Sequence, residues 1–283
     1  MWVLLSLMAA TLLGLGTVLQ QRGTLDDPRG SAGGNVQFLA GLLRRRVWLL
    51  GIAVGGLGEI WQFLALGSGP LAGVQALTTL SLVISLPFGV WLTDQRLTRS
   101  VWAGACATTL GIMLFVLVGA PQIGARSVTA TAWWSAGLTG AGLVVIVSCV
   151  AFGRSAAVQA MLFGAAAGLA FALVSAVSKS LIGHLGGGLG EVVASWELYV
   201  LAGAGLVGFT MGQFALRTGA LAPAMASTNS VTLLGAVVLS LTVFGETFSP
   251  GPDHLVAAAC GLTLTVFGVI LLARAPAAEP EEA

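Results

Sequence analysis

Long apolar runs, broken by short clusters of charged residues, glycine and proline, make up most of the sequence. A helix needs about 20 consecutive, predominantly apolar residues to cross the hydrocarbon core of a bilayer. Nine runs are close to that length, and the pattern predicts an all-α polytopic membrane protein with about nine transmembrane helices. The expected spans cover residues 2–20, 47–67, 70–92, 100–119, 129–151, 156–180, 195–216, 220–244 and 254–273.

The segments that connect the expected spans differ in length. Only GSGP separates the second span from the third, and only RTGAL separates the seventh from the eighth, so each pair is expected to form a tight antiparallel hairpin. The longest connection is 21–46, and its second half, NVQFLAGLLRRR, has the amphipathic pattern of a helix on the membrane surface. The acidic end of the chain, 275–283, is expected to be a disordered tail.

Composition supports lipid as the main solvent of this chain. Hydrophobic residues make up 57% of it and charged residues only 8%, whereas soluble domains carry about 25% charged residues. So few charges cannot cover a surface exposed to water, which makes the lipid bilayer the expected partner. The net charge of +1 gives no indication of a nucleic-acid partner.

The basic residues are unevenly distributed between the two sides of the predicted membrane domain. Lys and Arg favour the cytoplasmic side. With nine spans, ten arginines fall on one side, and only Arg126 and Lys179 fall on the other. This split predicts a multi-pass protein of the cell (cytoplasmic) membrane with its N-terminus outside and its C-terminus in the cytoplasm. An even number of spans would place both termini on one side, so the split favours an odd count.

The sequence also contains an internal repeat with an offset of 150 residues. Nine of the 24 positions from 55 to 78 are identical to the positions 150 residues later, Gly55 and Gly205 among them. The second and seventh spans are five apart in order, so the two copies would cross the membrane in opposite directions. Inverted repeats are typical of secondary transporters, whose substrate site lies near mid-membrane. The expected organisation is a first repeat with spans one to four and the cytoplasmic loop 21–46 (1–122), a second, inverted repeat with spans five to nine (123–274), and a cytoplasmic tail (275–283).

Glu59 is the principal candidate for chemistry inside the membrane. It lies about 18 Å into the second span, near the middle of a ~30 Å hydrocarbon core. A carboxylate at that depth costs about 3 kcal/mol and normally faces water, substrate or a partner. Phe209 occupies the equivalent position of the second repeat, so the acid belongs to one half alone. One interpretation is a pathway residue that binds a proton or cation, and the other is a protonated side chain bonded to a backbone carbonyl.

Other polar or aromatic side chains are expected to line the same pathway. Gln62 shares the glycine-rich face of its span, Trp61 could form a cavity wall, and Thr79 and Asn229 are repeat partners. An interhelical hydrogen bond is the alternative role for each polar residue. The candidate pathway residues are Gln20, Glu59, Trp61, Gln62, Thr79, Gln213 and Asn229, with Glu59 as the only candidate metal ligand.

Two more acids, Asp94 and Glu246, are expected at the cytoplasmic and outer ends of spans. Their expected role is to solvate a helix end or to pair with Arg96 or Arg99. This interpretation gives neither acid a part in the transport pathway.

Several motifs resemble the drug/metabolite transporter (DMT) superfamily, and most closely its NIPA-like magnesium transporter branch. They are GEIWQFLALGSGPLAGVQALTTLSLVISLPFGVWLTDQRLT, the following AGACATTLGIMLFVLVGAP, and LGTVLQQRG at 15–23. The resemblance covers 10–122 well and 156–273 more weakly. It implies an EamA-like helical bundle with an inverted repeat, and it makes membrane transport the expected activity. The family's basic cluster is replaced here by Gln20, Gln21 and Arg22, which leaves magnesium open as the substrate.

Three functions follow as hypotheses. The first is a secondary transporter of a small solute, with proton coupling through Glu59. The second is a Mg²⁺ or other divalent-cation permease of the NIPA type, and the third is a non-transporting scaffold or accessory subunit. Nothing in the sequence has the spacing of a hydrolase or nucleotide-binding motif in the required context, so we expect no enzyme activity and no cofactor. A homodimer is left open.

Overall fold

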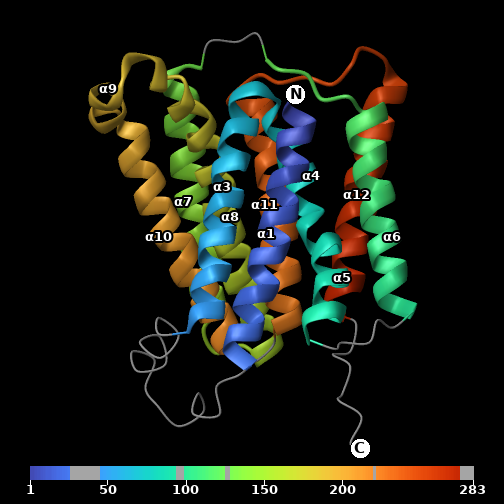
Figure 1. The fold of residues 1–283 in the computed structure, drawn as a ribbon. Coiled ribbons are helices and arrows are strands. Elements are labelled where there is room, and N and C mark those ends of the chain that lie inside the picture. The colour runs from blue at the N-terminus through green and yellow to red at the C-terminus, as the bar shows by residue number, and fades with distance from the viewer. Residues whose placement is uncertain (26–44, 94–98, 125–127, 219–220, 275–283) are drawn as a thin grey trace, which may run out of the picture.

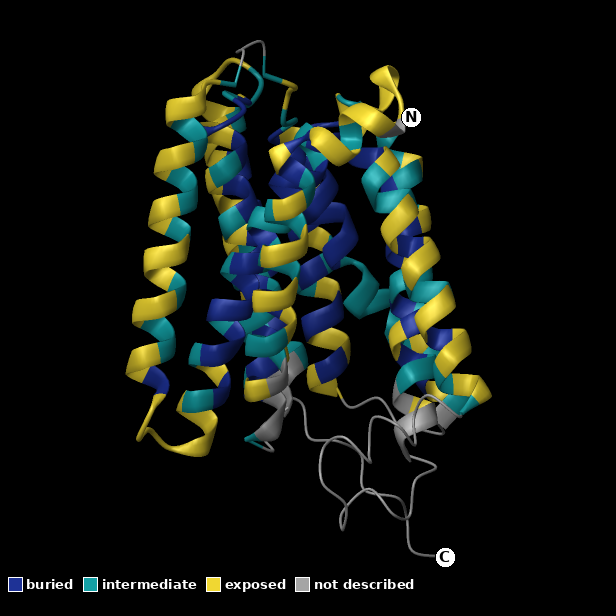
Figure 2. Ribbon diagram, turned by 90° about the vertical axis from the view of Figure 1, so that its left-hand side faces the viewer, coloured by how far each residue is buried: buried dark blue, intermediate teal, exposed yellow. Residues whose placement is uncertain are grey.

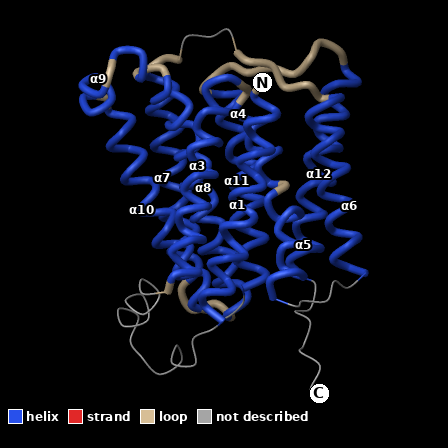
Figure 3. The backbone as a smooth tube through the Cα atoms, viewed as in Figure 1, coloured by secondary structure: helices blue, strands red, loops and turns tan. Residues whose placement is uncertain are grey.

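The structure is a computed structural model that describes residues 1–25, 45–93, 99–124, 128–218 and 221–274. Those residues form a bundle of roughly aligned helices without a β-strand (Figures 1 and 3). We call the end of the bundle that carries Trp2 the upper end and the opposite end the lower end, as in Figure 1. The helices are α1 (Trp2–Leu25), α3 (Arg46–Ser68), α4 (Leu71–Thr79), α5 (Ser81–Thr93), α6 (Arg99–Met113), η1 (Leu114–Val118), α7 (Ala130–Ala151), α8 (Ala156–Ile182), η2 (Leu185–Gly187), α9 (Leu189–Ala194), α10 (Trp196–Arg217), α11 (Leu221–Thr242) and α12 (Pro252–Arg274).

Eight segments among the described residues are long and apolar enough to cross a bilayer. Each coincides with one of the predicted spans. The remaining predicted span corresponds to α10, a helix of 22 residues whose last side chains lie partly outside the description. The count of nine therefore remains a prediction. The predicted surface helix within 21–46, the tail 275–283, and Asp94 and Arg96 also lie outside the described residues.

The exposed surface of the bundle is strongly apolar. Figure 2 shows buried residues toward the middle of the bundle and exposed residues along the outer helices. Large hydrophobic side chains are among the most exposed, including Trp91 at 77%, Trp134 at 71% and Leu206 at 68%. A monomeric soluble protein rarely exposes contiguous apolar surface on this scale. The described helices therefore belong to a protein embedded in a membrane.

Close helix packing depends on glycine at two crossings. At the crossing of α1 with α3, a Cβ atom added to Gly51 would lie 2.7 Å from the backbone nitrogen of Gln20. At the crossing of α6 with α12, a Cβ atom added to Gly268 would lie 2.4 Å from the backbone nitrogen of Thr108. Small residues let helices approach closely where lipid supplies no hydrophobic driving force. The glycine-rich face of the second predicted span is therefore largely a packing surface against α1.

The upper end is closed by two loops that pair with each other. Gln122, which follows η1, forms an isolated antiparallel bridge with Thr247, which follows α11. The backbone nitrogen of Gln122 donates to the carbonyl of Thr247 over 2.7 Å, and the Gln122 amide donates to the Ser249 hydroxyl over 3.0 Å. The bridge joins the loop between the halves of the chain to the loop that precedes α12.

Candidate functional site

The third predicted span is broken into two helices near the middle of its length. α4 comprises nine residues, and every one of them is buried. At Leu80 the backbone nitrogen bonds to the carbonyl of Leu77 rather than continuing the α-helical pattern, and α5 begins at Ser81. α4 packs against α1, α3, α8 and α11 and occupies the centre of the bundle (Figure 1). At about 1.5 Å per residue, α4 ends about 14 Å below its start, near the middle of a bilayer core.

Glu246 binds the N-terminus of this buried half-helix. Its Oε1 accepts a hydrogen bond from the backbone nitrogen of Leu71 over 2.8 Å, and its Oε2 accepts one from Ala72 over 3.5 Å. The Ser240 hydroxyl donates to Oε2 as well. A carboxylate in this position satisfies backbone N–H groups that have no partner within the helix, and its charge complements the helix dipole. Glu246 therefore fixes the upper end of α4.

Lys179 of α8 completes the charge balance at the same place. Its ammonium group forms an ion pair with Glu246 Oε1 and donates to the carbonyl of Gly69 over 2.7 Å. It also lies 5.2 Å from the centroid of the Phe244 ring. The side chains of Lys179 and Glu246 are 12% and 1% exposed. We call Lys179, Glu246, Ser240 and the backbone at Gly69 and Leu71 the upper clamp.

The upper clamp corrects the expected role of Glu246. This acid neither solvates an exposed helix end nor pairs with Arg99, because it is buried and its charged partner is Lys179. Both residues stand out in the sequence, because Lys179 is the only lysine of the chain and Glu246 follows an apolar span, but 67 residues separate them. Charged residues in apolar surroundings need a partner, but one-dimensional spacing does not identify which one.

A second polar contact lies one turn along α4. The hydroxyl of Ser175 in α8 donates to Gln75 Oε1 of α4 over 3.1 Å, and both residues are buried. Neither was predicted as a site residue. Together with the upper clamp, this contact joins α4 to α8 by side-chain hydrogen bonds at two levels.

Two of the predicted pathway residues bond within their own helices. The Thr79 hydroxyl donates to the carbonyl of Gln75 over 2.9 Å, and the Asn229 amide donates to the carbonyl of Met225 over 2.8 Å. Ser and Thr hydroxyls commonly bond in this way when no other acceptor is near. The carbonyl oxygen of the Asn229 side chain has no hydrogen-bond partner among the described residues.

Glu59 lies at the middle of α3 without a polar protein partner. It makes no hydrogen bond or ion pair with any residue in the described part of the chain. Its side chain is exposed, although neighbouring parts of the bundle crowd it on the remaining sides. The alternative role, a bond to a neighbouring backbone carbonyl, has no support here.

The other predicted pathway residues have more ordinary surroundings. Trp61 and Gln62 are half-buried on α3. The Gln20 amide donates to the carbonyl of Gly51 over 3.4 Å, which is the alternative role expected for it, an interhelical hydrogen bond. The side chain of Gln213 lies outside the described residues. No hydrogen bond joins the described members of the predicted set to one another.

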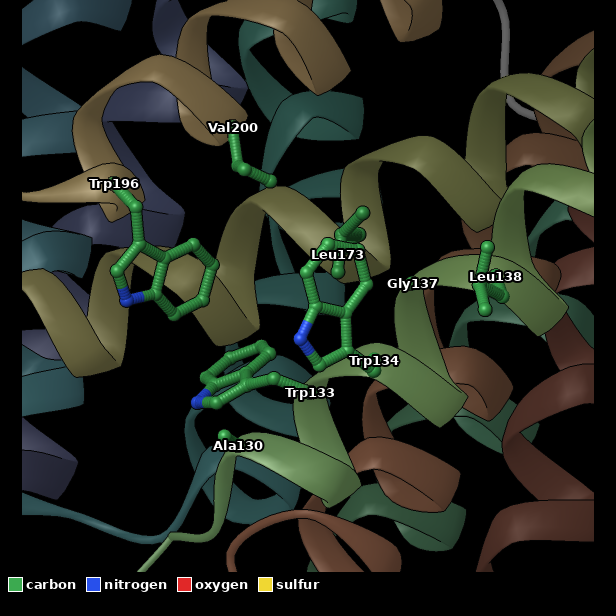
Figure 4. A pocket seen from close by; sticks show the side chains of 8 residues that line it. All are labelled: Ala130, Trp133, Trp134, Gly137, Leu138, Leu173, Trp196 and Val200. Carbon is green, nitrogen blue, oxygen red and sulfur yellow. The ribbon is translucent and has the colours of Figure 1, made fainter.

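An apolar cavity opens beside α7 and carries no chemistry of its own. It has a volume of about 490 Å³ and lies between α7, α8 and α10. Figure 4 shows the indole rings of Trp133, Trp134 and Trp196 around it. The rings of Trp133 and Trp196 meet edge to face with centroids 5.2 Å apart. No charged side chain lines this cavity, as expected of a surface that contacts lipid tails.

Comparison with known proteins finds a relative of this chain. The chain is 26% identical over 275 residues to an uncharacterized protein of Corynebacterium glutamicum, a match that covers 96% of this chain and 94% of the relative. No protein family and no solved structure matches the chain. The fold by itself defines a membrane-embedded helical protein.

Proposed function

We propose that this protein is a secondary transporter of a small solute, with the upper end of the bundle outside the cell and the lower end in the cytoplasm. The observation that carries the proposal is the depth of two negative groups. Glu59 lies nine residues before the end of α3, and α4 is nine residues long. Both therefore lie about 14 Å below the upper end of their helices, near the middle of the membrane.

The chemistry at that depth favours a cation or a proton. The C-terminus of a helix carries a partial negative charge, and Glu59 adds a carboxylate at the same level. Discontinuous helices whose ends meet an ion or substrate at mid-membrane are a recurring device of secondary transporters. The break between α4 and α5 fits this device, and so does the absence of a counter-ion for Glu59 among the described residues.

The packing of the helices supports the proposed inverted repeat. In the first half α1 packs along α3 and contacts α4 and α5, and in the second half α8 packs along α10 and α11. The final helices of the two halves, α6 and α12, pack against each other. An inverted repeat that matches spans one to four with spans six to nine would produce this pairing. α7 is then the unmatched span, and it packs mainly on α8.

Transport can be tested with purified protein in proteoliposomes. Uptake and efflux of Mg²⁺ and of a metabolite panel would be measured with and without an imposed pH gradient, for wild type and for Glu59→Gln. Glu191→Gln, which neutralises an exposed acid of α9, is the matched control. A flux that Glu59→Gln abolishes and Glu191→Gln preserves supports the proposal. Flux of Mg²⁺ alone would indicate the divalent-cation permease, and no flux of any solute would favour a scaffold.

A further inference from the structure

We propose that Ser180, His184 and Glu197 form a binding site for a divalent transition-metal ion at the upper end of the bundle. Ser180 lies in the last turn of α8, His184 directly precedes η2, and Glu197 is the second residue of α10. Glu197 Oε1 accepts a hydrogen bond from the Ser180 hydroxyl over 3.0 Å and lies 3.2 Å from His184 Nε2. The inference does not depend on the proposed transport function.

The carboxylate of Glu197 is buried and incompletely satisfied. Its side chain is 5% exposed, and its second oxygen, Oε2, has no hydrogen-bond partner among the described residues. No Lys or Arg among the described residues forms an ion pair with the Glu197 carboxylate. An unpaired buried carboxylate oxygen is costly, and the N-terminus of α10 offsets that cost only in part. A cation bound to this carboxylate would remove the cost.

The spacing of the donors suits a metal ion. With bonds of about 2.0–2.2 Å, an ion bound to two atoms 3.2 Å apart has an angle between those bonds of about 100°, which lies between octahedral and tetrahedral values. An imidazole with a carboxylate suits Zn²⁺ or Ni²⁺, whereas Mg²⁺ prefers oxygen ligands alone. His184 would bind through the lone pair of Nε2 and carry its proton on Nδ1. The unpartnered Oε2 leaves Glu197 able to bind through both oxygens.

The site is accessible from one side. The His184 side chain is 42% exposed, so an ion can reach the imidazole before it meets the buried carboxylate. Water would complete the coordination on the open side, which predicts modest affinity and ready exchange.

Tryptophan fluorescence offers a direct assay, because Trp196 precedes Glu197 and contacts Trp133 (Figure 4). We expect Ni²⁺ to quench the fluorescence of the purified protein saturably, EDTA to reverse the quenching, Zn²⁺ to compete and Mg²⁺ not to compete. The experiment is made in a background in which the exposed cysteines, which also bind these metals, are replaced by alanine: Cys106, Cys149 and Cys260.

The two histidines of the chain provide the matched pair of variants. His184→Gln and Glu197→Gln should each weaken Ni²⁺ binding by about tenfold or more. His254→Gln should leave binding unchanged, because His254 faces the carbonyl of Val118 instead. As a second readout, Zn²⁺ should raise the thermal unfolding temperature of the parent and of His254→Gln but not of His184→Gln.

Three results would overturn the site: no saturable quenching, equal binding by His184→Gln and its parent, or equal loss in His254→Gln. Competition by Mg²⁺ would do the same, since it would mean that the imidazole contributes nothing. If Glu197→Gln does not fold, the binding measured for His184→Gln decides whether the site exists. The His184 side chain is substantially exposed, so its replacement leaves the core intact.

Discussion

Replacement of Lys179, the positively charged residue of the upper clamp, should destabilise the protein severely. In Lys179→Met the carboxylate of Glu246 stays buried, at 1% exposure, with its bonds to Leu71 and Ser240 but without a positive partner. Removing one partner of a buried ion pair typically costs 3–5 kcal/mol, because the remaining charge is uncompensated. Because Lys179 retains slight exposure, we expect the free energy of unfolding to fall by about 3 kcal/mol, which corresponds to a fall in unfolding temperature of roughly 10 °C.

The measurement is thermal unfolding of the purified protein in detergent, followed by tryptophan fluorescence. Arg154→Met, which removes an exposed cation, is the control and should change the unfolding temperature little. Lys179→Met/Glu246→Gln should recover part of the loss, because it no longer leaves a buried charge. If Lys179→Met unfolds at the wild-type temperature, or if the double variant shows the sum of the single losses, the clamp does not stabilise α4 as described.

Three further outcomes follow from the geometry. Glu59→Gln should abolish flux in proteoliposomes while its unfolding temperature matches that of wild type, because the carboxylate bonds to no described residue; a lost fold would mean that Glu59 has a structural role instead. Gly268→Ala should lower the unfolding temperature, because the added Cβ atom would lie 2.4 Å from the backbone nitrogen of Thr108. Gly137→Ala is the control: no atom lies within 4 Å of its Cβ position, so the unfolding temperature should stay the same or rise. Ser175→Ala should cost about 1 kcal/mol in chemical unfolding through the lost bond to Gln75; no measurable change would mean that water replaces that bond.

The sequence predicted the helices because lipid imposes a simple rule on them. Every backbone polar group in the membrane must bond within its own segment, so span length and apolar content define a transmembrane helix almost alone. Eight spans of the described chain match their expected positions within a few residues. The break at Leu80 was not predicted, because LTTLSLVISL reads as one continuous apolar run. Pro87 lies seven residues beyond the break and does not mark it.

The candidate site was predicted less completely than the fold. Glu59 was proposed because a single carboxylate in the middle of an apolar run is visible without knowledge of contacts. The upper clamp was missed because Lys179 and Glu246 each lie near a span end, where water normally solvates a charge. Only the packing of α8 against α4 and α11 shows that these two charges are buried. Thr79 was expected in the pathway as the repeat partner of Asn229, and Gln20 as a polar residue at the end of the first span, but both side chains bond to nearby backbone.

The upper clamp and Glu59 lie at different depths of the bundle and are expected to have different roles in the proposed transporter. The upper clamp ties α4 of the first half to α8 and the α11–α12 loop of the second, with its charges paired and buried, so it resists any separation of the halves at that end. Glu59 lies about 14 Å further from the upper end, at the level where α4 ends, and has no charged partner in the described part of the chain. A paired charge stabilises one arrangement, whereas an unpaired one can change its bound partner without loss of the fold. For the proposed transporter we therefore expect the ion or proton to bind at Glu59, and we expect a separation of the helices at the upper end to require that the contact between Lys179 and Glu246 breaks.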